Sequence, residues 1–302
     1  MCSEKTYKPL YTAMKRILML FIVAFAVVGA QAQEETQVQE QAQEKERQGD
    51  LKVMTYNIRF ATLKDGKNAW VHRKEASIAM INDQKPDVFA MQEVLFRQKA
   101  YFDVMLLENY QGVGVGRENG KKKGEHTTIH WNRNTLNMLD WGTLWLSETP
   151  ETPSVGWDAW HPRTFTWMLL EKKDSGKKFY FVNIHLDHAG GQAQKNGLAL
   201  VKKLMDEKNV DGYPVIMVGD FNVTPNNAII TDFNSVMKNA TQHAESVDTE
   251  ESFNQWGERF LTLDYVFYDG FSKCHYYDVI TEKYAEKEWI SDHFPVTAEF
   301  TF

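Results

Sequence analysis

Short apolar runs of strand length, each closed by polar residues, recur along most of this chain and limit the folds open to it. Alternating or continuous apolar runs of this length are typical of half-buried or buried strands, whereas apolar residues spaced three and four apart are typical of helices. The strand-like segments are 51–59, 87–91, 127–131, 136–146, 164–170, 179–185, 214–218, 263–268 and 296–300, and the helix-like segments are 71–82, 96–108 and 193–206. Many strands with a few interspersed helices predict a layered α/β sandwich, although periodicity leaves the strand order open.

The first 32 residues have the three parts of a signal peptide. Lys15 and Arg16 precede an apolar run at 17–28, and Ala30-Gln31-Ala32 offers a small-residue cleavage site. The apolar run is shorter than the roughly 20 residues that span a bilayer, although an uncleaved anchor is the alternative. The segment predicts export to the periplasm or the medium, with Met14 as an alternative start and no membrane insertion after cleavage.

Residues 33–50 are nearly all polar and rich in Gln and Glu, which predicts a disordered spacer. Residues 51–302 are long enough for one large domain with a substantial core. The net charge of −7 argues against a protein that grips long stretches of nucleic acid. Cys274 is the one cysteine after the signal segment, so the mature chain has neither an internal disulfide nor a cysteine-based zinc site.

Six short polar clusters stand at or near the ends of the strand-like runs, where α/β sheets tend to place their sites. A single Asp or His after a strand is often only a turn or capping residue, so the informative feature is that all six occur together. The clusters are Thr55-Tyr56-Asn57, Gln92-Glu93, Asn183-Ile184-His185, Gly219-Asp220-Phe221-Asn222, Leu263-Asp264-Tyr265 and Ser291-Asp292-His293-Phe294-Pro295.

In these clusters the chain resembles the endonuclease/exonuclease/phosphatase superfamily, which includes pancreatic deoxyribonuclease, abasic-site endonucleases, inositol polyphosphate phosphatases and bacterial sphingomyelinases. The clusters at 219–222 and 291–295 are the most specific elements, and the resemblance covers essentially all of 51–302. The segment 112–187, particularly 142–150, is similar to an exported bacterial branch. The resemblance implies a four-layer α/β/β/α sandwich of two mixed, mainly antiparallel β-sheets flanked by helices.

The residue types suit the hydrolysis of a phosphate ester, which needs charge neutralisation, an in-line water and help for the leaving oxygen. The resemblance places Asn57, Glu93 and Asp292 nearest the principal metal, and Asp220 and Asn222 beside the nucleophile or at a second metal position. Carboxylate and amide oxygens favour Mg²⁺, Mn²⁺ or Ca²⁺ over zinc. We therefore expect Mg²⁺, or Mn²⁺ or Ca²⁺ in its place, as the cofactor.

Two histidines complete the catalytic set that the resemblance implies. His293 pairs with Asp264, and a carboxylate beside an imidazole fixes its tautomer and stabilises its charged form. His293 then acts as a general base or holds the scissile phosphate, with Asp220 as the rival for orienting the water. His185 contacts a phosphate oxygen or protonates the leaving group, and Glu125 is expected to orient it.

The expected substrate contacts come from polar and aromatic residues near these motifs. Arg163 is a candidate phosphate clamp because guanidinium binds phosphate in a bidentate manner, but it could equally be a surface arginine. Aromatic residues in the loops around Trp157 and Asn254 could stack on a ligand or pack in the core. The residues that we assign to substrate binding are Arg163, Asn183, Asp187, His188, Trp157 and Asn254.

The sequence therefore predicts an exported, divalent-metal-dependent phosphoesterase that hydrolyses a phosphodiester or phosphomonoester by in-line attack of water. A non-catalytic module that binds a phosphate ligand on the same fold is the alternative, although every expected polar position is filled. Nucleic acid or a nucleotide, a phosphorylated sugar and a lipid head group all remain open as substrates. We expect a monomer with no stable protein partner.

Overall fold

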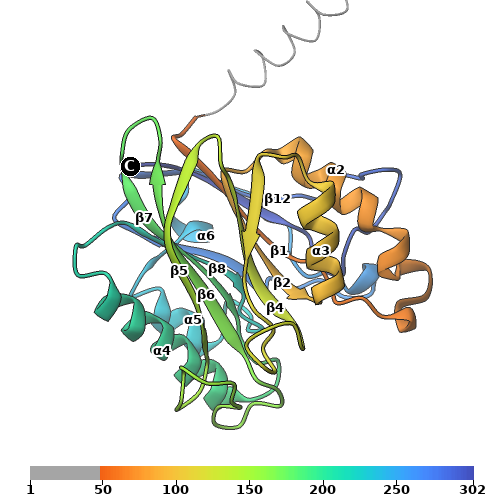
Figure 1. Cartoon of the computed structure of the whole chain (residues 1–302), viewed down its shortest axis with the longest axis horizontal. Helices are drawn as coiled ribbons and strands as arrows, with labels where there is room; N and C mark the ends of the chain where they lie inside the picture. Colours follow the sequence, from red (N-terminus) through yellow and green to blue (C-terminus); the bar gives the residue numbers. More distant parts are fainter. Residues whose placement is uncertain (1–47) are drawn as a thin grey trace, which may run out of the picture. The chain divides into compact units, whose positions relative to one another are not determined.

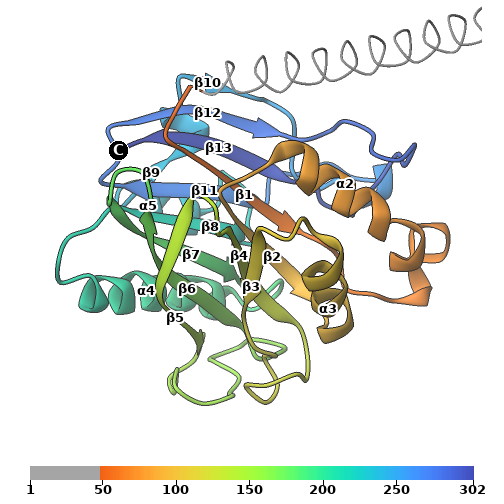
Figure 2. The same cartoon turned by 45° about the horizontal axis from the view of Figure 1, so that its top comes forward.

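Two β-sheets stacked face to face form the centre of the structure, and helices cover their outer faces (Figures 1 and 2). A computed structural model describes residues 48–302. The predicted signal peptide at 1–32 and residues 33–47 of the predicted spacer lie outside the described residues. Residues Gly49–Phe302 form one compact unit. Within the described part of the chain, no helix has the length and apolarity needed to cross a bilayer.

The first sheet has seven strands, three of them from the C-terminal quarter of the chain. These strands are β1 (Leu51–Asn57), β2 (Val88–Val94), β3 (Tyr110–Val113), β4 (His126–Asn132), β10 (Ser246–Val247), β12 (Lys273–Val279) and β13 (Val296–Thr301). Their order is β10-β12-β13-β1-β2-β4-β3. The β1–β2 and β10–β12 pairs are parallel, and the other neighbours are antiparallel.

The second sheet has six strands. These are β5 (Leu136–Trp145), β6 (Thr164–Lys172), β7 (Lys178–His185), β8 (Val215–Asp220), β9 (Lys238–Asn239) and β11 (Asp264–Asp269). Their order is β5-β6-β7-β8-β11-β9, and only β7–β8 is parallel. Gly219 permits the close approach of this parallel pair, since a Cβ atom there would lie 1.9 Å from the carbonyl oxygen of Ile184.

The helices form the two outer layers. They are α2 (Lys74–Gln84), α3 (Phe96–Met105), α4 (Gly191–Lys208), α5 (Ala228–Phe233) and α6 (Ala240–His243), with short 3₁₀ helices η1 (Leu63–Asn68), η2 (Trp70–His72) and η3 (Gln255–Gly257). Met80 of α2 and Phe102 of α3 share a buried cluster with Phe89 of the first sheet. Leu198 and Val201 of α4 pack in a cluster with the outer face of the second sheet.

A third apolar cluster fills the space between the sheets. Val53 and Val88 of the first sheet meet Phe181 and Val218 of the second within it. Burying two sheet faces against each other and two outer faces against helices gives the four layers. The predicted α/β/β/α sandwich of two mixed, mainly antiparallel sheets is therefore confirmed.

Strand direction and register bring the polar clusters to one edge of the sandwich. The parallel strands β1 and β2 end there together, with Asn57 opposite Gln92, and β7 and β8 end with His185 opposite Asp220. Strand β11 runs antiparallel to β8, so its first residue, Asp264, lies opposite Asp220. The opposite end of β1 carries Leu51 beside Phe300 of β13, so the two ends of this unit lie next to each other, away from the polar edge.

Candidate active site

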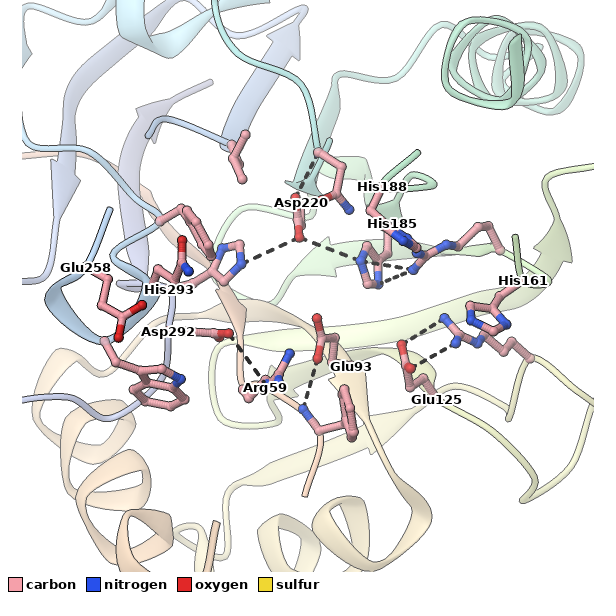
Figure 3. Close-up of a pocket in the computed structure, with 18 residues that line it drawn as sticks. Arg59, Glu93, Glu125, His161, His185, His188, Asp220, Glu258, Asp292 and His293 are labelled. Carbon is pink, nitrogen blue, oxygen red and sulfur yellow. Dashed lines mark hydrogen bonds and ion pairs between the residues drawn. The ribbon is translucent and has the colours of Figure 1, made fainter. Parts of the chain in front are cut away.

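The polar edge surrounds a cleft of about 710 Å³, whose lining is drawn in Figure 3. The lining combines acids, histidines, arginines and aromatic side chains from both sheets and their loops. These residues are Arg59, Phe60, Glu93, Arg117, Glu125, His161, Arg163, His185, His188, Asp220, Asn222, Phe253, Gln255, Trp256, Glu258, Leu263, Asp292 and His293. Seven of the predicted catalytic and metal residues thus meet in one cavity: Glu93, Glu125, His185, Asp220, Asn222, Asp292 and His293.

His293 is held by Asp264 as the motifs predicted. Its Nδ1 lies 2.8 Å from Asp264 Oδ2, and that carboxylate oxygen also accepts a hydrogen bond of 2.7 Å from the Ser252 hydroxyl. Its Nε2 points toward Asp220, 3.8 Å from Oδ2. Burial lowers the pKa of His293, but the charges of Asp264 and Asp220 outweigh it and raise the pKa to about 10. The imidazole is therefore fixed in direction and favoured in its charged form.

Asp220 is the acid shared by both histidines. Its Oδ2 lies 3.6 Å from His185 Nε2, on the side opposite His293, and accepts a hydrogen bond of 3.0 Å from Asn57 Nδ2. Burial raises the pKa of Asp220 to about 7, with Asp264 adding to this shift and His293 opposing it. A carboxylate that accepts a proton near neutral pH is suited to general base chemistry.

Glu93 and Asp292 supply two carboxylates to the same side of the cleft (Figure 3). Glu93 Oε2 accepts the amide hydrogen of Phe60 at 3.0 Å, and Asp292 Oδ2 lies 3.7 Å from Arg59 Nε. Burial raises the pKa of Asp292, and the charge of Glu93 adds to this against the opposing charges of His293 and Arg59. A carboxylate whose pKa is raised partly by a neighbouring carboxylate is a favourable position for binding a cation.

The donor chemistry fits a hard cation. Mg²⁺ keeps several waters and is usually bound through one or two carboxylates, which Glu93 and Asp292 can provide. Across residues 48–302, no group of three or more His, Cys, Asp or Glu side chains is arranged to enclose a metal by itself. Carboxylate ligands such as Glu93 and Asp292 suit Mg²⁺ or Mn²⁺, whereas structural zinc sites are built mostly from Cys and His.

Asn57 has a different orientation from the one expected of a metal ligand. Its amide nitrogen donates to Glu93 Oε1 at 3.3 Å and to Asp220, while its oxygen accepts the amide hydrogen of Arg59 at 3.0 Å. In this structure Asn57 therefore bridges two carboxylates as a donor. A rotation of the amide would be needed before its oxygen could face a cation.

His185 and Arg163 form the opposite wall of the cleft. Arg163 Nη1 lies 3.1 Å from His185 Nε2, its Nη2 lies 3.0 Å from His188 Nδ1, and its Nε donates to Asp187 Oδ2 at 3.2 Å. Burial, followed by the charge of Arg163, holds the pKa of His185 well below its usual range. A neutral imidazole is better placed to hold a phosphoryl oxygen than to donate a proton to a leaving group.

Glu125 lies in the cleft but not in the expected partnership. It forms a bidentate ion pair with Arg117, at 2.8 and 2.9 Å, instead of a hydrogen bond with His185. Burial, followed by the charge of Glu93, raises the pKa of Glu125 to about 7, although Arg117 opposes the shift. The guanidinium geometry explains the difference, because its two parallel N–H groups match a carboxylate better than one ring nitrogen does.

Four residues assigned to substrate binding lie behind or beside the cleft lining. Asn183 is buried between the sheets and donates to the carbonyl oxygens of Met91 and Thr128, so it joins the two sheets. Asp187 is buried behind Arg163, and its Oδ1 accepts two backbone amide hydrogens of the following turn. The remaining two are Trp157 and Asn254, which the lining does not include.

Asn222 has a structural role in addition to its place in the lining. Its backbone is left-handed, with φ of 53°, and its amide hydrogen binds Asp220 Oδ1 at 2.8 Å. Its side chain donates to the carbonyl oxygen of Leu186 at 3.0 Å. Asn222 therefore fixes the Asp220 carboxylate and the loop that follows His185.

A buried arginine that the motifs did not identify joins the chain segments behind the cleft. The Arg73 guanidinium donates to four carbonyl oxygens, those of Ile58, Arg59 at 2.8 Å, Asn68 at 2.9 Å and Ile290 at 3.0 Å. Two of these follow β1 directly, and the Ile290 carbonyl lies two residues before Asp292. Arg73 therefore holds the segment that follows Asn57 against the segment that carries Asp292.

The motifs also did not identify Arg59, Arg117 or Ser252. Arg59 stands two residues after the end of β1 and could have been noticed because it extends the Asn57 cluster. Arg117 and Ser252 lie in loops far from any strand-end motif. Only the fold brings Arg117 to the cleft and Ser252 to Asp264.

Several known proteins are similar to this chain in sequence and structure. The model of the Endonuclease/Exonuclease/phosphatase family matches residues 54–293. A mannosyl-6-phosphatase from Bacteroides thetaiotaomicron VPI-5482 is 32% identical, with a TM-score of 0.79 over 83% of this chain and 100% of that chain. An endonuclease/exonuclease/phosphatase from Bacteroides vulgatus is 30% identical, with a TM-score of 0.78 over 83% of this chain and 98% of that chain. An uncharacterized protein of Acanthamoeba polyphaga mimivirus is 27% identical over an alignment of 273 positions, which covers 83% of this chain and 100% of the viral protein.

The family match spans most of the chain, and two relatives reach the level of identity at which a family is shared. The family resemblance indicated by the motifs is therefore confirmed. The chain belongs to the endonuclease/exonuclease/phosphatase family.

Proposed function

We propose that this protein is a divalent-metal-dependent phosphomonoesterase that acts on a small phosphorylated sugar. The observation that carries the proposal is the meeting of three carboxylates, Glu93, Asp220 and Asp292, with two histidines in one cleft. Ester hydrolysis at phosphorus needs a cation, a base for water and groups that hold the phosphoryl oxygens. Each need has a candidate residue at this site.

Glu93 and Asp292 would hold the cation, with Mg²⁺ as the first choice and Mn²⁺ or Ca²⁺ as substitutes. When bound, it neutralises phosphoryl charge and stabilises the oxygen that departs. The Asp220 carboxylate accepts a proton from the attacking water, whose oxygen forms a bond to phosphorus as the ester P–O bond breaks. The departing alkoxide takes a proton from solvent, and the products are inorganic phosphate and an alcohol.

The histidines and Arg163 position the phosphoryl group. His293, cationic beside Asp264, offers Nε2–H to one phosphoryl oxygen, and neutral His185 donates the N–H of its ring to another. Arg163 supplies permanent positive charge behind His185. The three side chains favour the charge that builds up in the transition state because they are fixed before the substrate arrives.

The proposal of a monoester follows from how charge is distributed along the cleft. Arg117, Arg163, His161 and His188 gather at one end, where the Arg117–Glu125 ion pair forms part of the lining. A terminal phosphate fits such an end, whereas a phosphodiester needs room for a second substituent beyond phosphorus. The similarity to a mannosyl-6-phosphatase supports a phosphorylated sugar as the substrate class.

The location and assembly state are further parts of the proposal. The apolar run at 17–28 and the cleavage site after it support export, and the mature enzyme is proposed to act as a monomer without a stable protein partner. Fractionation of cells expressing the whole chain, followed by N-terminal sequencing of the product, tests both export and cleavage. A product retained in the cytoplasm with its N-terminus intact contradicts this part alone.

A panel of substrates and metals tests the chemistry. The purified protein is incubated in EDTA, then with Mg²⁺, Mn²⁺ or Ca²⁺, on hexose 6-phosphates, p-nitrophenyl phosphate, bis-p-nitrophenyl phosphate, single- and double-stranded DNA, and phospholipids. We expect activity only with added metal, and faster release of phosphate from monoesters than cleavage of diesters. Full activity in excess chelator, or a strong preference for the diester or DNA, would rule the proposal out.

A further inference from the structure

One wall of the cleft has a chemistry that phosphate hydrolysis alone does not need. Phe253, Gln255, Trp256 and Glu258 come from a single loop and line the end opposite Arg117 and Arg163. Figure 3 shows Glu258 and His161 at opposite ends of the cavity, with Asp220 and Glu93 between them. This loop therefore adds an acidic side chain and aromatic side chains to its end of the cleft, where Arg59 is the basic residue of the lining.

The loop holds an unusual backbone. Gln255, Trp256 and Gly257 are consecutive left-handed residues, with φ of 44°, 60° and 88°. Residues other than glycine rarely take this conformation, and they keep it only where surrounding contacts enforce it. Backbone strain of this kind is common at ligand sites, so Trp256 is a candidate for contact with a ligand.

Hydrogen bonds hold the loop in this conformation and fix it against the segment that carries Asp292 and His293. The amide hydrogens of Asn254 and Gln255 both bind the carbonyl oxygen of Asp292, at 2.8 and 3.1 Å. Asn254 Oδ1 accepts the amide hydrogen of Trp256 at 2.8 Å, and its Nδ2 donates to the Ser291 carbonyl at 3.2 Å. The position of the Trp256 ring is therefore set by the same segment that carries a proposed metal ligand.

Two further contacts fix the wall. The Phe253 ring lies 4.9 Å from the ring of His293, edge to face, which gives the catalytic histidine an apolar neighbour on this side. The Arg73 guanidinium lies 5.6 Å from the Trp256 ring. These contacts fix the wall in place before a ligand binds.

The side chains on this wall match an uncharged, polyhydroxylated group. A half-buried tryptophan offers a flat apolar face to the C–H surface of a sugar ring, while Gln255 and Glu258 offer an amide and a carboxylate to its hydroxyls. Glu258 is exposed and negative, so it opposes a second phosphate or a polynucleotide at this end.

We propose that the 253–258 loop is the leaving-group subsite of this enzyme and binds a hexose whose phosphate lies between His293 and His185, on the side toward Arg163. The inference rests on the proposed phosphomonoesterase function and adds to it the residues that select the substrate. The Trp256 ring stacks against the sugar ring, and Gln255 and Glu258 form hydrogen bonds with the sugar hydroxyls. A nucleoside, which could also stack on Trp256, lacks the ring of hydroxyls that this pair of side chains can satisfy.

The test compares substrates that differ only in the leaving group. The kcat/KM for mannose 6-phosphate and glucose 6-phosphate is measured against p-nitrophenyl phosphate, which has no hydroxyls, and against adenosine 5′-monophosphate. The variants are Trp256→Ala and Glu258→Gln, and Glu251→Gln is the matched control because it removes an exposed carboxylate of the same segment that does not line the cleft. Glu258 is exposed, so its variant tests the idea even if Trp256→Ala folds poorly.

We expect each of the two cleft variants to lower the ratio of the kcat/KM values, hexose 6-phosphate over p-nitrophenyl phosphate, by about tenfold. Free hexose should inhibit p-nitrophenyl phosphate hydrolysis by the wild type, and this inhibition should weaken in Trp256→Ala. Glu251→Gln should leave both substrates and the inhibition unchanged.

Three results would overturn the inference. They are an equal fall on all substrates, an unchanged hexose ratio in Glu258→Gln, and a wild-type preference for adenosine monophosphate over every hexose phosphate. If p-nitrophenyl phosphate is hydrolysed normally while the ratios do not move, only the subsite is wrong. If no monoester is hydrolysed with any metal, the proposed function fails and the subsite with it.

Discussion

At the scale of single side chains, Asp264 controls the state of His293. Its carboxylate touches the imidazole Nδ1, and the other ring nitrogen faces the cleft. Asp264→Asn keeps the shape but removes the charge that stabilises the imidazolium, so we expect kcat to fall about 100-fold or more with a small change in KM. Steady-state kinetics on p-nitrophenyl phosphate measure this.

Asp269→Asn is the matched control, because it changes an exposed aspartate at the other end of the same strand. It should behave like the wild type. A fall of less than about threefold in Asp264→Asn would mean that the charge of Asp264 contributes little to the role of His293.

Arg73 is the second side chain whose substitution has a specific expected effect, here on stability. Lysine keeps the positive charge but cannot reach four carbonyl oxygens, so Arg73→Lys leaves buried acceptors without donors. We expect the free energy of unfolding to fall by about 3 kcal/mol, as measured by urea denaturation at one pH.

Arg133→Lys provides the comparison, since Arg133 also donates to a carbonyl oxygen but on the exposed surface. Its effect should stay within about 0.5 kcal/mol. Equal losses in the two variants would show that burial and the number of bonds at Arg73 do not set its contribution.

At the scale of elements, β4 carries a histidine whose burial makes stability depend on pH. His130 stacks on Phe89 of β2, with ring centroids 4.9 Å apart, and its Nε2 lies 3.5 Å from Asp103 of α3. Burial lowers the pKa of His130; Asp103 opposes this, and Lys99 adds to it. The unfolded chain therefore binds a proton at a higher pH than the folded chain does.

The sign of the effect follows from this difference. As pH falls through the ordinary histidine pKa of about 6.5, the unfolded state gains a proton that the folded state does not, and stability is lost. His130 contributes at most about 1.4 kcal/mol of this loss per pH unit below 6.5.

The measurement is urea unfolding of the wild type and His130→Leu at pH 7.5 and 5.5. Whatever its stability at pH 7.5, the variant should lose less on acidification. An identical loss in both proteins would show that His130 takes up a proton as readily when folded as when unfolded.

The helices and strands also show how much of the fold could be predicted from the sequence. The long strands and helices were predicted, such as 179–185 for β7 and 193–206 for α4, because their apolar residues repeat with the right period. Strand β12 was missed because KCHYYDV mixes charged residues into a strand with few aliphatic side chains, and β3, β9 and β10 are too short to show a period. The arrangement of two sheets in four layers was predicted from the family resemblance and not from periodicity.

The site was predicted in part for the same reason. Glu93, Asp220 and His293 stand in compact motifs beside strands, and the cleft contains them all. The Arg117–Glu125 pair depends on loop conformation, and the position of Asn183 depends on how the two sheets pack. Local spacing predicts neither arrangement, so the sequence could not show that Glu125 pairs with Arg117 or that Asn183 lies between the sheets.

At the scale of the whole molecule, the proposed cation should couple to stability. A ligand that binds only the folded state stabilises it, by about 2.7 kcal/mol when present at 100 times its Kd. We expect the Tm to rise and level off with added MgCl₂ in the wild type, and to stay flat in Glu93→Gln. Differential scanning fluorimetry from EDTA-treated protein measures both.

Sodium chloride at matched ionic strength separates binding from screening of the net charge of −7. Glu108→Gln, which changes an exposed glutamate outside the cleft lining, should respond to MgCl₂ as the wild type does. A Tm that rises equally with sodium chloride, or in Glu93→Gln, would count against a cation held by that carboxylate.

The pairing of Leu51 with Phe300 has a practical meaning for the way this enzyme can be handled. Both ends of the catalytic unit leave it together, on the side away from the substrate entrance. A bead, a dye or a fused protein attached at either end therefore leaves the entrance open, and one attachment site serves as well as the other. The same adjacency would let a short linker join the ends, so that the chain could be reopened at a surface loop without separating the strands that deliver the acids and imidazoles.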